Sequence, residues 1–339
     1  MLDVLSSAPT RIDIGGATLD IDPLHQILKH PVTINIAVNL RATVRISRSR
    51  NNKYSITSED QRINISGDYQ TICSLESLPW SALLFDTVWQ SDFPPISIVM
   101  NADSPAGAGL GGSSCLGVAI LGALLKARSQ IDPSYLPLDE QDFVSMVKDL
   151  ETKLIKVPTG CQDYWAAVRG GLNIIRFPPG RTHVQTKKTS SLGSLSEELI
   201  LCNSGSSRPS SLNNWEIFKS AFEGSTHVLD MLEKIGEKTE EIIESINKED
   251  LSNILKISME EWALRKELWP KIMTEKTLKL EEIALRAGAK AVRVCGAGGG
   301  GVMAIFADLD RKEEVSRALI EGGGDILDTT MTDAGLCIE

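Results

Sequence analysis

The sequence has no long apolar run, and it is short of positive charge. Its longest apolar stretch, Leu116 to Leu125, is interrupted by two glycines and is far shorter than the roughly 20 residues that a membrane-spanning helix needs. The 45 acidic residues outnumber the 35 basic ones, which gives a net charge of −10. This balance argues against a duplex nucleic-acid binder and against a polybasic membrane-surface protein. We therefore expect neither nucleic acid nor a membrane as a partner.

Signals for secretion and for structural metal are also missing. The first residues, MLDVLSSAPTRIDI, lack the basic start and the uninterrupted apolar block of a secretory signal. The six cysteines and four histidines are scattered along the chain, without a CxxC or another metal-ligand spacing. We therefore expect a cytoplasmic protein with reduced thiols and no structural zinc.

The length of 339 residues corresponds to about two domains, and the patterns predict an α+β fold. Residues 32–47 alternate apolar and polar side chains, as a half-buried strand does, and residues 140–156 repeat apolar side chains at helical spacing. A Ser, Thr and Pro-rich passage after Pro178 suggests a boundary between domains 1–180 and 181–339. Further strands are predicted at 96–100, 171–177, 198–204, 292–295, 302–306 and the C-terminus, and further helices at 114–128, within 213–287 and at 311–321.

Nine of the 27 glycines lie in two short loops, PAGAGLGGSS at 105–114 and GAGGGG at 296–301. Such loops let the backbone approach a ligand closely, and the first opens a predicted helix whose free N–H groups would attract an anion. We therefore interpret the first loop as a phosphate site, with a tight turn as the alternative. For the second loop, a glycine-rich hairpin is the stronger alternative.

Both loops contain the GxGxxG pattern of dinucleotide-binding folds, but the context differs. In that fold a strand runs directly into the first glycine, whereas residues 101–106 separate the predicted strand from Gly107. The second loop is followed by a strand and not by a helix. The chain also has no GxxxxGK[ST] sequence, which excludes a P-loop.

Three motifs occur in the order typical of one family: APTRIDIGGATLD at 8–20, PAGAGLGGSS at 105–114 and CGAGGGG at 295–301. With them the chain resembles the GHMP kinases, which include galactokinase, homoserine kinase and mevalonate kinase. The resemblance implies an N-terminal ATP-binding domain with a left-handed βαβ unit and a ferredoxin-like C-terminal domain. It also likens residues 199–211, LILCNSGSSRPSS, to the first strand and turn of the C-terminal domain.

The resemblance also assigns roles to individual residues. Asp163 matches the catalytic aspartate, and Arg11 matches a basic residue that faces the transferred phosphoryl group. Ser113 and Glu151 match the ligands of Mg²⁺. Our alternatives are a helix cap for Asp163, a surface position for Arg11 and a buried salt bridge for Glu151. The ATP-binding residues would be Pro105, Gly107, Ala108, Gly109, Leu110, Gly111, Gly112, Ser113 and Ser114.

The acceptor is indicated by Asp20, which aligns with the acid of the GGGTD-type motif in heptose-phosphate and fucose kinases. Its two oxygens could accept bonds from sugar hydroxyls. Residues 17–19 depart from that motif, and the GEH sequences of galactokinase and mevalonate kinase are absent. Further candidate substrate residues are Gly16, His25, Gly298 and Gly299, with a surface loop as the alternative for His25.

The sequence therefore predicts a kinase that uses ATP and Mg²⁺ and acts as a monomer or homodimer. We expect it to phosphorylate a sugar or sugar phosphate, on its anomeric hydroxyl. The alternatives are a kinase of the mevalonate or homoserine type and a sugar and ATP sensor without catalytic activity.

Overall fold

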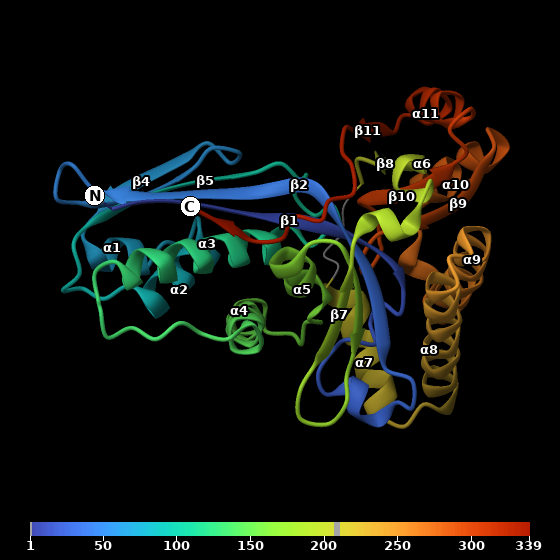
Figure 1. The fold of residues 1–339 in the computed structure, drawn as a ribbon, viewed down its shortest axis with the longest axis horizontal. Coiled ribbons are helices and arrows are strands. Elements are labelled where there is room, and N and C mark those ends of the chain that lie inside the picture. The colour runs from blue at the N-terminus through green and yellow to red at the C-terminus, as the bar shows by residue number, and fades with distance from the viewer. Residues whose placement is uncertain (1, 207–210) are drawn as a thin grey trace.

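The computed structural model describes residues 2–206 and 211–339. The chain folds into two units, each built on a sheet with helices packed against it (Figure 1). The turn predicted after the strand at 198–204 lies mostly outside the described residues. No helix in the described ranges is long and apolar enough to cross a membrane.

The first sheet has eight strands and is organised around two long antiparallel ones, β1 (Asp3–Gly15) and β2 (Val32–Arg48). The second half of β2 pairs with β5 and its first half pairs with β6, so β2 spans the whole unit. The strand order is β12-β1-β2-β5-β3-β4, with β6 and β7 extending from β2. The remaining strands are β3 (Tyr54–Ser58), β4 (Ile63–Gly67), β5 (Ile96–Ala102), β6 (Leu172–Arg176), β7 (His183–Lys187) and β12 (Cys337–Ile338).

Helices cover one side of this sheet (Figure 1). The central one is α3 (Gly112–Ser129), which is apolar around most of its circumference because it packs against β1 and β2 on one side and other helices on the other. Its start at the first glycine loop places the helix N-terminus at the end of β5. The other helices are α1 (Tyr69–Cys73), α2 (Pro79–Val88), α4 (Glu140–Ile155) and α5 (Gln162–Arg169).

The second sheet is antiparallel throughout, in the order β11-β8-β10-β9. With helices between β8 and β9 and between β10 and β11, this is the ferredoxin-like arrangement that the resemblance implied. Its strands are β8 (Leu199–Asn203), β9 (Ala289–Val294), β10 (Val302–Ala307) and β11 (Asp325–Leu327). Its helices are α6 (Leu195–Glu198), α7 (Ser211–Phe222), α8 (Thr226–Asn247), α9 (Leu251–Leu268), α10 (Glu275–Arg286) and α11 (Lys312–Glu321).

The two units share an apolar core, and the last segment of the second unit returns to the first. One apolar cluster contains Ile12 and Ile34 of the first sheet together with Leu201 and Ala304 of the second. The C-terminal segment returns from the second unit to the first, where Asn39 donates to the Thr330 carbonyl (2.8 Å) and β12 pairs with β1. Strands β7 and β12, both beyond residue 180, therefore belong to the first sheet, and the division at residue 180 stays a prediction.

Candidate active site

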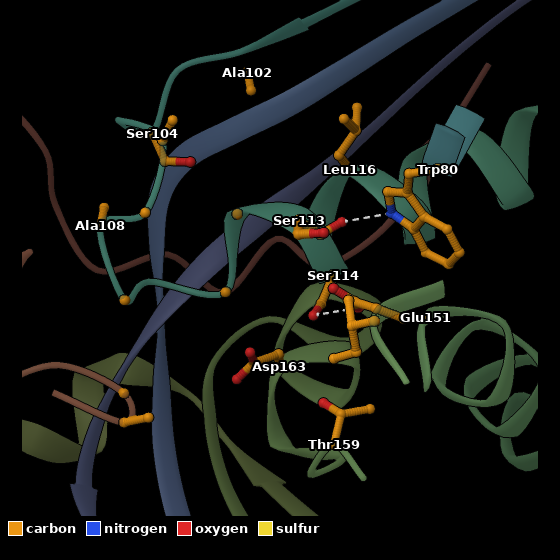
Figure 2. Close-up of a pocket in the computed structure, with 18 of the residues that line it drawn as sticks. Trp80, Ala102, Ser104, Ala108, Ser113, Ser114, Leu116, Glu151, Thr159 and Asp163 are labelled. Atoms are coloured by element: carbon orange, nitrogen blue, oxygen red, sulfur yellow. Dashed lines mark hydrogen bonds between the residues drawn. The ribbon is translucent and has the colours of Figure 1, made fainter. Parts of the chain in front are cut away.

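A cavity of about 490 Å³ lies where the two units meet. The first unit lines it with β1 and the segment after β1, with the first glycine loop, and with α2, α4 and α5. The second unit contributes Asn214 of α7 and the start of the second glycine loop. Figure 2 shows Ser113, Ser114, Glu151 and Asp163 gathered around this space. The predicted site residues that line it are Arg11, Asp20, Pro105, Gly107, Ala108, Gly109, Gly111, Gly112, Ser113, Ser114, Glu151 and Asp163.

The first glycine loop ends in the N-terminus of α3, as predicted. Gly111 caps the helix with φ 73°, a left-handed conformation that favours glycine. The first N–H groups of a helix have no intrahelical partners, and here they start at a loop that lines the cavity. Leu110 is the exception in the loop, because its side chain is fully buried in the core and its carbonyl accepts from the Arg11 N–H (3.1 Å). The geometry is that of an anion site.

The two glycine loops contact each other through their backbones. Val302 N–H donates to the Ala108 carbonyl (2.8 Å), just after the second loop. A Cβ atom on Gly109 would lie 2.5 Å from the Cys295 carbonyl oxygen, and one on Gly296 would lie 2.6 Å from that of Gly109. Several of these glycines are therefore required by the approach of one loop to the other, and not only by a ligand.

Gly298 and Gly299, predicted to bind substrate, lie outside the cavity lining. Gly299 N–H donates to the Ile272 carbonyl (2.8 Å), and a Cβ atom on Gly298 would overlap the Ile272 side chain. The lining residues from this loop are Gly296 and Ala297. The structure thus shows a packing role for the middle of the loop.

Asp163 and Arg11 form an ion pair at the centre of the cavity. Arg11 Nε and Nη2 both lie 2.6 Å from Asp163 Oδ1, and Arg11 Nη1 donates to the Gly109 carbonyl (2.6 Å). Burial would lower the pKa of Arg11, but the carboxylates of Asp163 and Asp13 raise it above its usual value. Arg11 is therefore a buried, permanently charged side chain, which rules out the surface position we considered. Asp163 lies in the first turn of α5.

Asp20 lies in the same cavity, beside Asp163. Its Oδ2 accepts from the Gln162 N–H (2.9 Å), and the absence of a side chain at Gly160 leaves room for the carboxylate. Burial raises the pKa of Asp20 to about 6, and the nearby Asp163 charge adds to the shift. This carboxyl group is thus close to half-protonated near pH 6.

Glu151 of α4 is buried and paired by hydroxyl groups rather than by a cation. Its Oε2 accepts from Ser114 Oγ (2.8 Å, dashed in Figure 2) and from the Tyr164 hydroxyl (2.7 Å). Burial raises the pKa of Glu151, although the hydroxyls of Tyr164, Ser113 and Ser114 act in the opposite direction. In the part of the chain that the structure describes, no basic side chain forms the buried salt bridge with Glu151 that was our alternative.

Among residues 2–206 and 211–339, no group of three or more His, Cys, Asp and Glu side chains is arranged to hold a metal ion. A magnesium ion needs fewer protein ligands, because it usually binds through one or two carboxylates together with substrate phosphates and water. Glu151 and Ser113, both at the cavity beside the anion site, are oxygen donors of the kind that Mg²⁺ prefers. The residues present therefore fit this ion.

Two further predicted residues lie elsewhere. Gly16 is behind the cavity, where its N–H donates to Glu261 Oε1 (3.1 Å) and a side chain would overlap the Val32 carbonyl. His25 stacks on Phe177 with ring centroids 4.8 Å apart and lines a separate hollow. Neither is part of the cavity lining.

Other lining residues were not found from the sequence. Trp80 of α2 donates from Nε1 to the Ser113 carbonyl (3.0 Å, dashed in Figure 2) and so fixes the start of α3. Thr18 donates to Asn214 Oδ1 (3.0 Å), which joins the segment after β1 to α7 across the cavity. Tyr164 is not in the lining, but its hydroxyl donates to Glu151. An aromatic or amide residue within a helix is interpreted from the sequence as core or surface, so no pattern identified Trp80, Asn214 or Tyr164.

Comparison with known proteins agrees with this geometry. The family model for the "GHMP kinases N terminal domain" matches residues 78–171, which include the first glycine loop, Glu151 and Asp163. The model for "GHMP kinases C terminal" matches residues 242–325. The chain belongs to the GHMP kinase family. It is a phosphotransferase that acts on a sugar or alcohol hydroxyl, and GHMP kinases use ATP as the phosphate donor.

Individual relatives are distant but match over their full length. The kinase is 23% identical to the D-glycero-α-D-manno-heptose 7-phosphate kinase of Campylobacter jejuni, over 99% of this chain and 98% of the relative. It is 25% identical to the mevalonate kinase of Pyrococcus furiosus, over 100% and 99%. A crystal structure of a D-glycero-D-manno-heptose 1-phosphate kinase from Bacteroides thetaiotaomicron superimposes with a TM-score of 0.77 at 23% identity, over 99% and 98% of the two chains. At that identity, the last match shows a common fold.

Proposed function

We propose that this kinase transfers the γ-phosphoryl group of ATP to a hydroxyl of a sugar or sugar phosphate, and that the hydroxyl is the anomeric one. The observation that carries the proposal is the placement of Asp20 beside the Arg11–Asp163 pair in one cavity. A buried carboxyl group there can accept or donate bonds to the hydroxyls of a polyol. The name of the Campylobacter jejuni relative indicates an acceptor of this class.

Each part of the transfer has a candidate residue. The loop backbone and the N-terminus of α3 would bind the phosphates of ATP. Asp163 would accept the proton of the attacking hydroxyl, and Arg11 would offset negative charge on the transferred group. Glu151 and Ser113 would hold Mg²⁺, which when bound neutralises charge on the phosphates. Catalysis would thus come from positioning and charge, without a covalent intermediate.

A mevalonate-type activity is the second candidate, because the Pyrococcus furiosus relative carries that name. Mevalonate offers an apolar methyl group and a carboxylate where a sugar offers hydroxyls, and a buried Asp20 would disfavour a second carboxylate nearby. The assembled Arg11, Asp163 and Glu151 also argue against a sensor without catalytic activity.

The test is a screen for ADP release with ATP and Mg²⁺, over monosaccharides, their 6- and 7-phosphates, mevalonate and homoserine. Phosphorus NMR of any product then identifies the phosphorylated carbon. We expect turnover with a sugar or sugar phosphate and a product phosphorylated at carbon 1. Turnover with mevalonate alone would contradict the sugar assignment, and a product phosphorylated elsewhere would contradict the anomeric one. The Asp163→Asn variant is the control for contaminating kinases.

A further inference from the structure

Behind the cavity, six charged side chains form a continuous network that joins the two units. Three are positive and three are negative, and all except Asp163 are buried. They come from β1 and α5 of the first unit and from α9 and β9 of the second. The members are Arg11, Asp13, Asp163, Glu261, Arg265 and Arg293.

Asp13 is the centre of this network and is fully buried. Its Oδ2 accepts from Arg265 Nη1 (3.0 Å) and Arg293 Nη2 (3.2 Å), and its Oδ1 lies 4.0 Å from Arg11 Nη1. Oδ1 also accepts from the Gly296 N–H (2.8 Å). Burial alone would raise the pKa of Asp13, but the three arginines and the Gly296 N–H hold it below its usual value. Asp13 is therefore an anion at neutral pH.

Through these contacts Asp13 reaches the cavity in two places. The first is Arg11, whose Nε and Nη2 contact Asp163 and whose Nη1 both donates to the Gly109 carbonyl and lies near Asp13 Oδ1. The second is Gly296, whose N–H is held by Asp13 and whose carbonyl accepts from Arg265 Nη2 (2.8 Å). Gly296 also packs against Gly109. One carboxylate thus lies 4.0 Å from the arginine of the cavity and binds a residue at the contact between the two glycine loops.

We propose that Asp13 is a positioning residue of the phosphoryl transfer, which holds Arg11 against Asp163 and the second glycine loop against the first. The proposal rests on the proposed function, because it concerns the same site. Without the Asp13 charge, Arg293 keeps the carboxylate of Glu261, whereas Arg265 loses the carboxylate with which it pairs. The uncompensated positive charge would then repel Arg11. Arg11 would then lose the position in which it meets the transferred group.

The experiment compares Asp13→Asn with Glu261→Gln. Both variants remove one buried carboxylate of the network and keep an amide oxygen that can accept the same backbone N–H. Glu261 contacts Arg293 and the Gly16 N–H, and none of its hydrogen bonds or ion pairs involves Arg11 or Gly296. It is therefore a matched control for loss of stability. Steady-state kcat, KM for ATP, KM for the acceptor and melting temperature are measured for both.

We expect Asp13→Asn to lower kcat by about tenfold to a hundredfold, because a misplaced Arg11 would weaken the chemical step. KM for ATP should change by less than about threefold. Glu261→Gln should lower the melting temperature by a similar amount while kcat stays near that of the wild type. The proposal would be overturned if both variants lost kcat in proportion to their loss of melting temperature. It would also be overturned if Asp13→Asn kept a kcat close to that of the wild type.

If Asp13→Asn does not fold, the Arg265→Lys variant tests the same proposal. Lysine keeps the positive charge beside Asp13 but lacks the planar fork that bonds Asp13 and the Gly296 carbonyl together. A folded Arg265→Lys variant with kcat lowered about tenfold supports the proposal, and an unchanged kcat overturns it. A wild-type protein that releases no ADP with any acceptor would refute the proposed function instead, which keeps the two failures distinct.

Discussion

The carboxylates of the cavity differ in exposure, and the difference matches the roles that we propose for them. The side chain of Asp163 is 23% exposed, whereas Asp20 and Glu151 are buried. A partly open carboxylate can meet an incoming hydroxyl, and the guanidinium of Arg11 holds this carboxylate in place. The buried carboxyl groups are held by the protein itself, Asp20 by Gln162 N–H and Glu151 by two hydroxyls.

Replacing Asp163 with asparagine should abolish most of the turnover and leave ATP binding nearly unchanged. The amide cannot accept a proton at neutral pH, so we expect kcat to fall by about two to four decades. Steady-state kinetics and calorimetric titration with ATP measure the two effects. A variant that kept more than about a tenth of wild-type kcat would leave Asp163 as a residue of the α5 N-terminus only.

Replacing Asp20 with asparagine should raise KM for the acceptor much more than KM for ATP. The carboxylate lies beside Asp163, where we propose that acceptor hydroxyls bind, while the proposed phosphate site lies at the first glycine loop. Loss of charge-assisted bonds corresponds to about one to three decades in kcat/KM. Kinetics with each substrate varied in turn separate the two constants. Equal changes in both would contradict a role in acceptor binding.

The same variant should change the dependence of stability on pH. The pKa of Asp20 is about 6 in the folded protein and 3.8 in the reference state, so the folded state binds this proton more tightly and stability falls as pH rises from about 4 to about 6. Asparagine removes that loss. Urea unfolding should therefore show the variant more stable at pH 7, by up to about 3 kcal/mol, and no such gain at pH 4. A gain that is equal at both pH values would mean that Asp20 titrates normally.

Replacing Tyr164 with phenylalanine should weaken the response to Mg²⁺. The ring stays in the core, but Glu151 loses one of the two hydroxyls that orient it, and support of this kind around a metal ligand is typically worth about 10-fold or more in affinity. Activity measured against Mg²⁺ concentration at saturating ATP tests this. An unchanged Mg²⁺ curve with a lowered melting temperature would show that Tyr164 serves only the fold.

Among the structural elements, the first glycine loop leaves little room for side chains beside the catalytic candidates. Gly111 has φ 73°, and a Cβ atom there would lie 2.8 Å from Asp163 Cγ and 2.9 Å from Asp163 Oδ2. We therefore expect Gly111→Ala to displace Asp163 and to lower kcat by at least about a hundredfold. Gly180→Ala is a matched control, because it also has positive φ but nothing lies within 4 Å of its Cβ position. Similar kcat values for the two variants would contradict this expectation.

The elements with a clear period were predicted and those without it were missed. The alternation of β2 and the helical spacing of α4 were confirmed. Residues 8–20 were recognised as a motif, but strand β1 was not predicted. Residues 8–15 are buried on both faces, so their burial does not alternate. Strands β3 and β4 do alternate in exposure, but each has only five residues. The periodicity of a sequence is therefore a weak signal where a strand is short, and it is absent where both faces of a strand are buried.

The sequence motifs identified residues that lie together in the cavity, but they did not show which glycines serve the packing of the fold. Arg11, Asp163 and Glu151 were identified from their places in the sequence, and they lie together. Gly298 and Gly299 were expected at the substrate because a glycine-rich loop suggests a ligand, but both lie outside the cavity lining. Gly298 makes room for the Ile272 side chain, and the Gly299 N–H donates to the Ile272 carbonyl. The sequence cannot distinguish a backbone that approaches phosphate from one that approaches another backbone.

In the whole molecule, the C-terminal segment ties the second unit to the first sheet. Leu5 and Glu339 exchange both backbone hydrogen bonds (3.0 and 2.8 Å), and Arg41 donates to the Gly335 carbonyl (2.7 Å). Deleting residues 329–339 should expose the outer edge of β1 and remove these contacts. We expect a lower melting temperature and self-association, because open strand edges pair with one another.

Light scattering and thermal unfolding measure both effects of this deletion. Adding the missing residues as a free peptide is the control, since a peptide that pairs with β1 should restore the melting temperature and the wild-type assembly state. A truncated protein with unchanged melting temperature would show that the segment contributes nothing to the joint between the units.

The position of β12 also affects how the nascent chain can fold during translation. The first sheet takes its edge strand from residues 337–338, which are synthesised after all four strands of the second sheet. Until then β1 has a bare outer edge, although residues 3–187, which provide the rest of the sheet, are already present. Domains usually fold in the order in which they emerge. Here the sheet that emerges first waits for a strand that is made after the second unit, and in that interval its edge is open to chaperones and to neighbouring nascent chains.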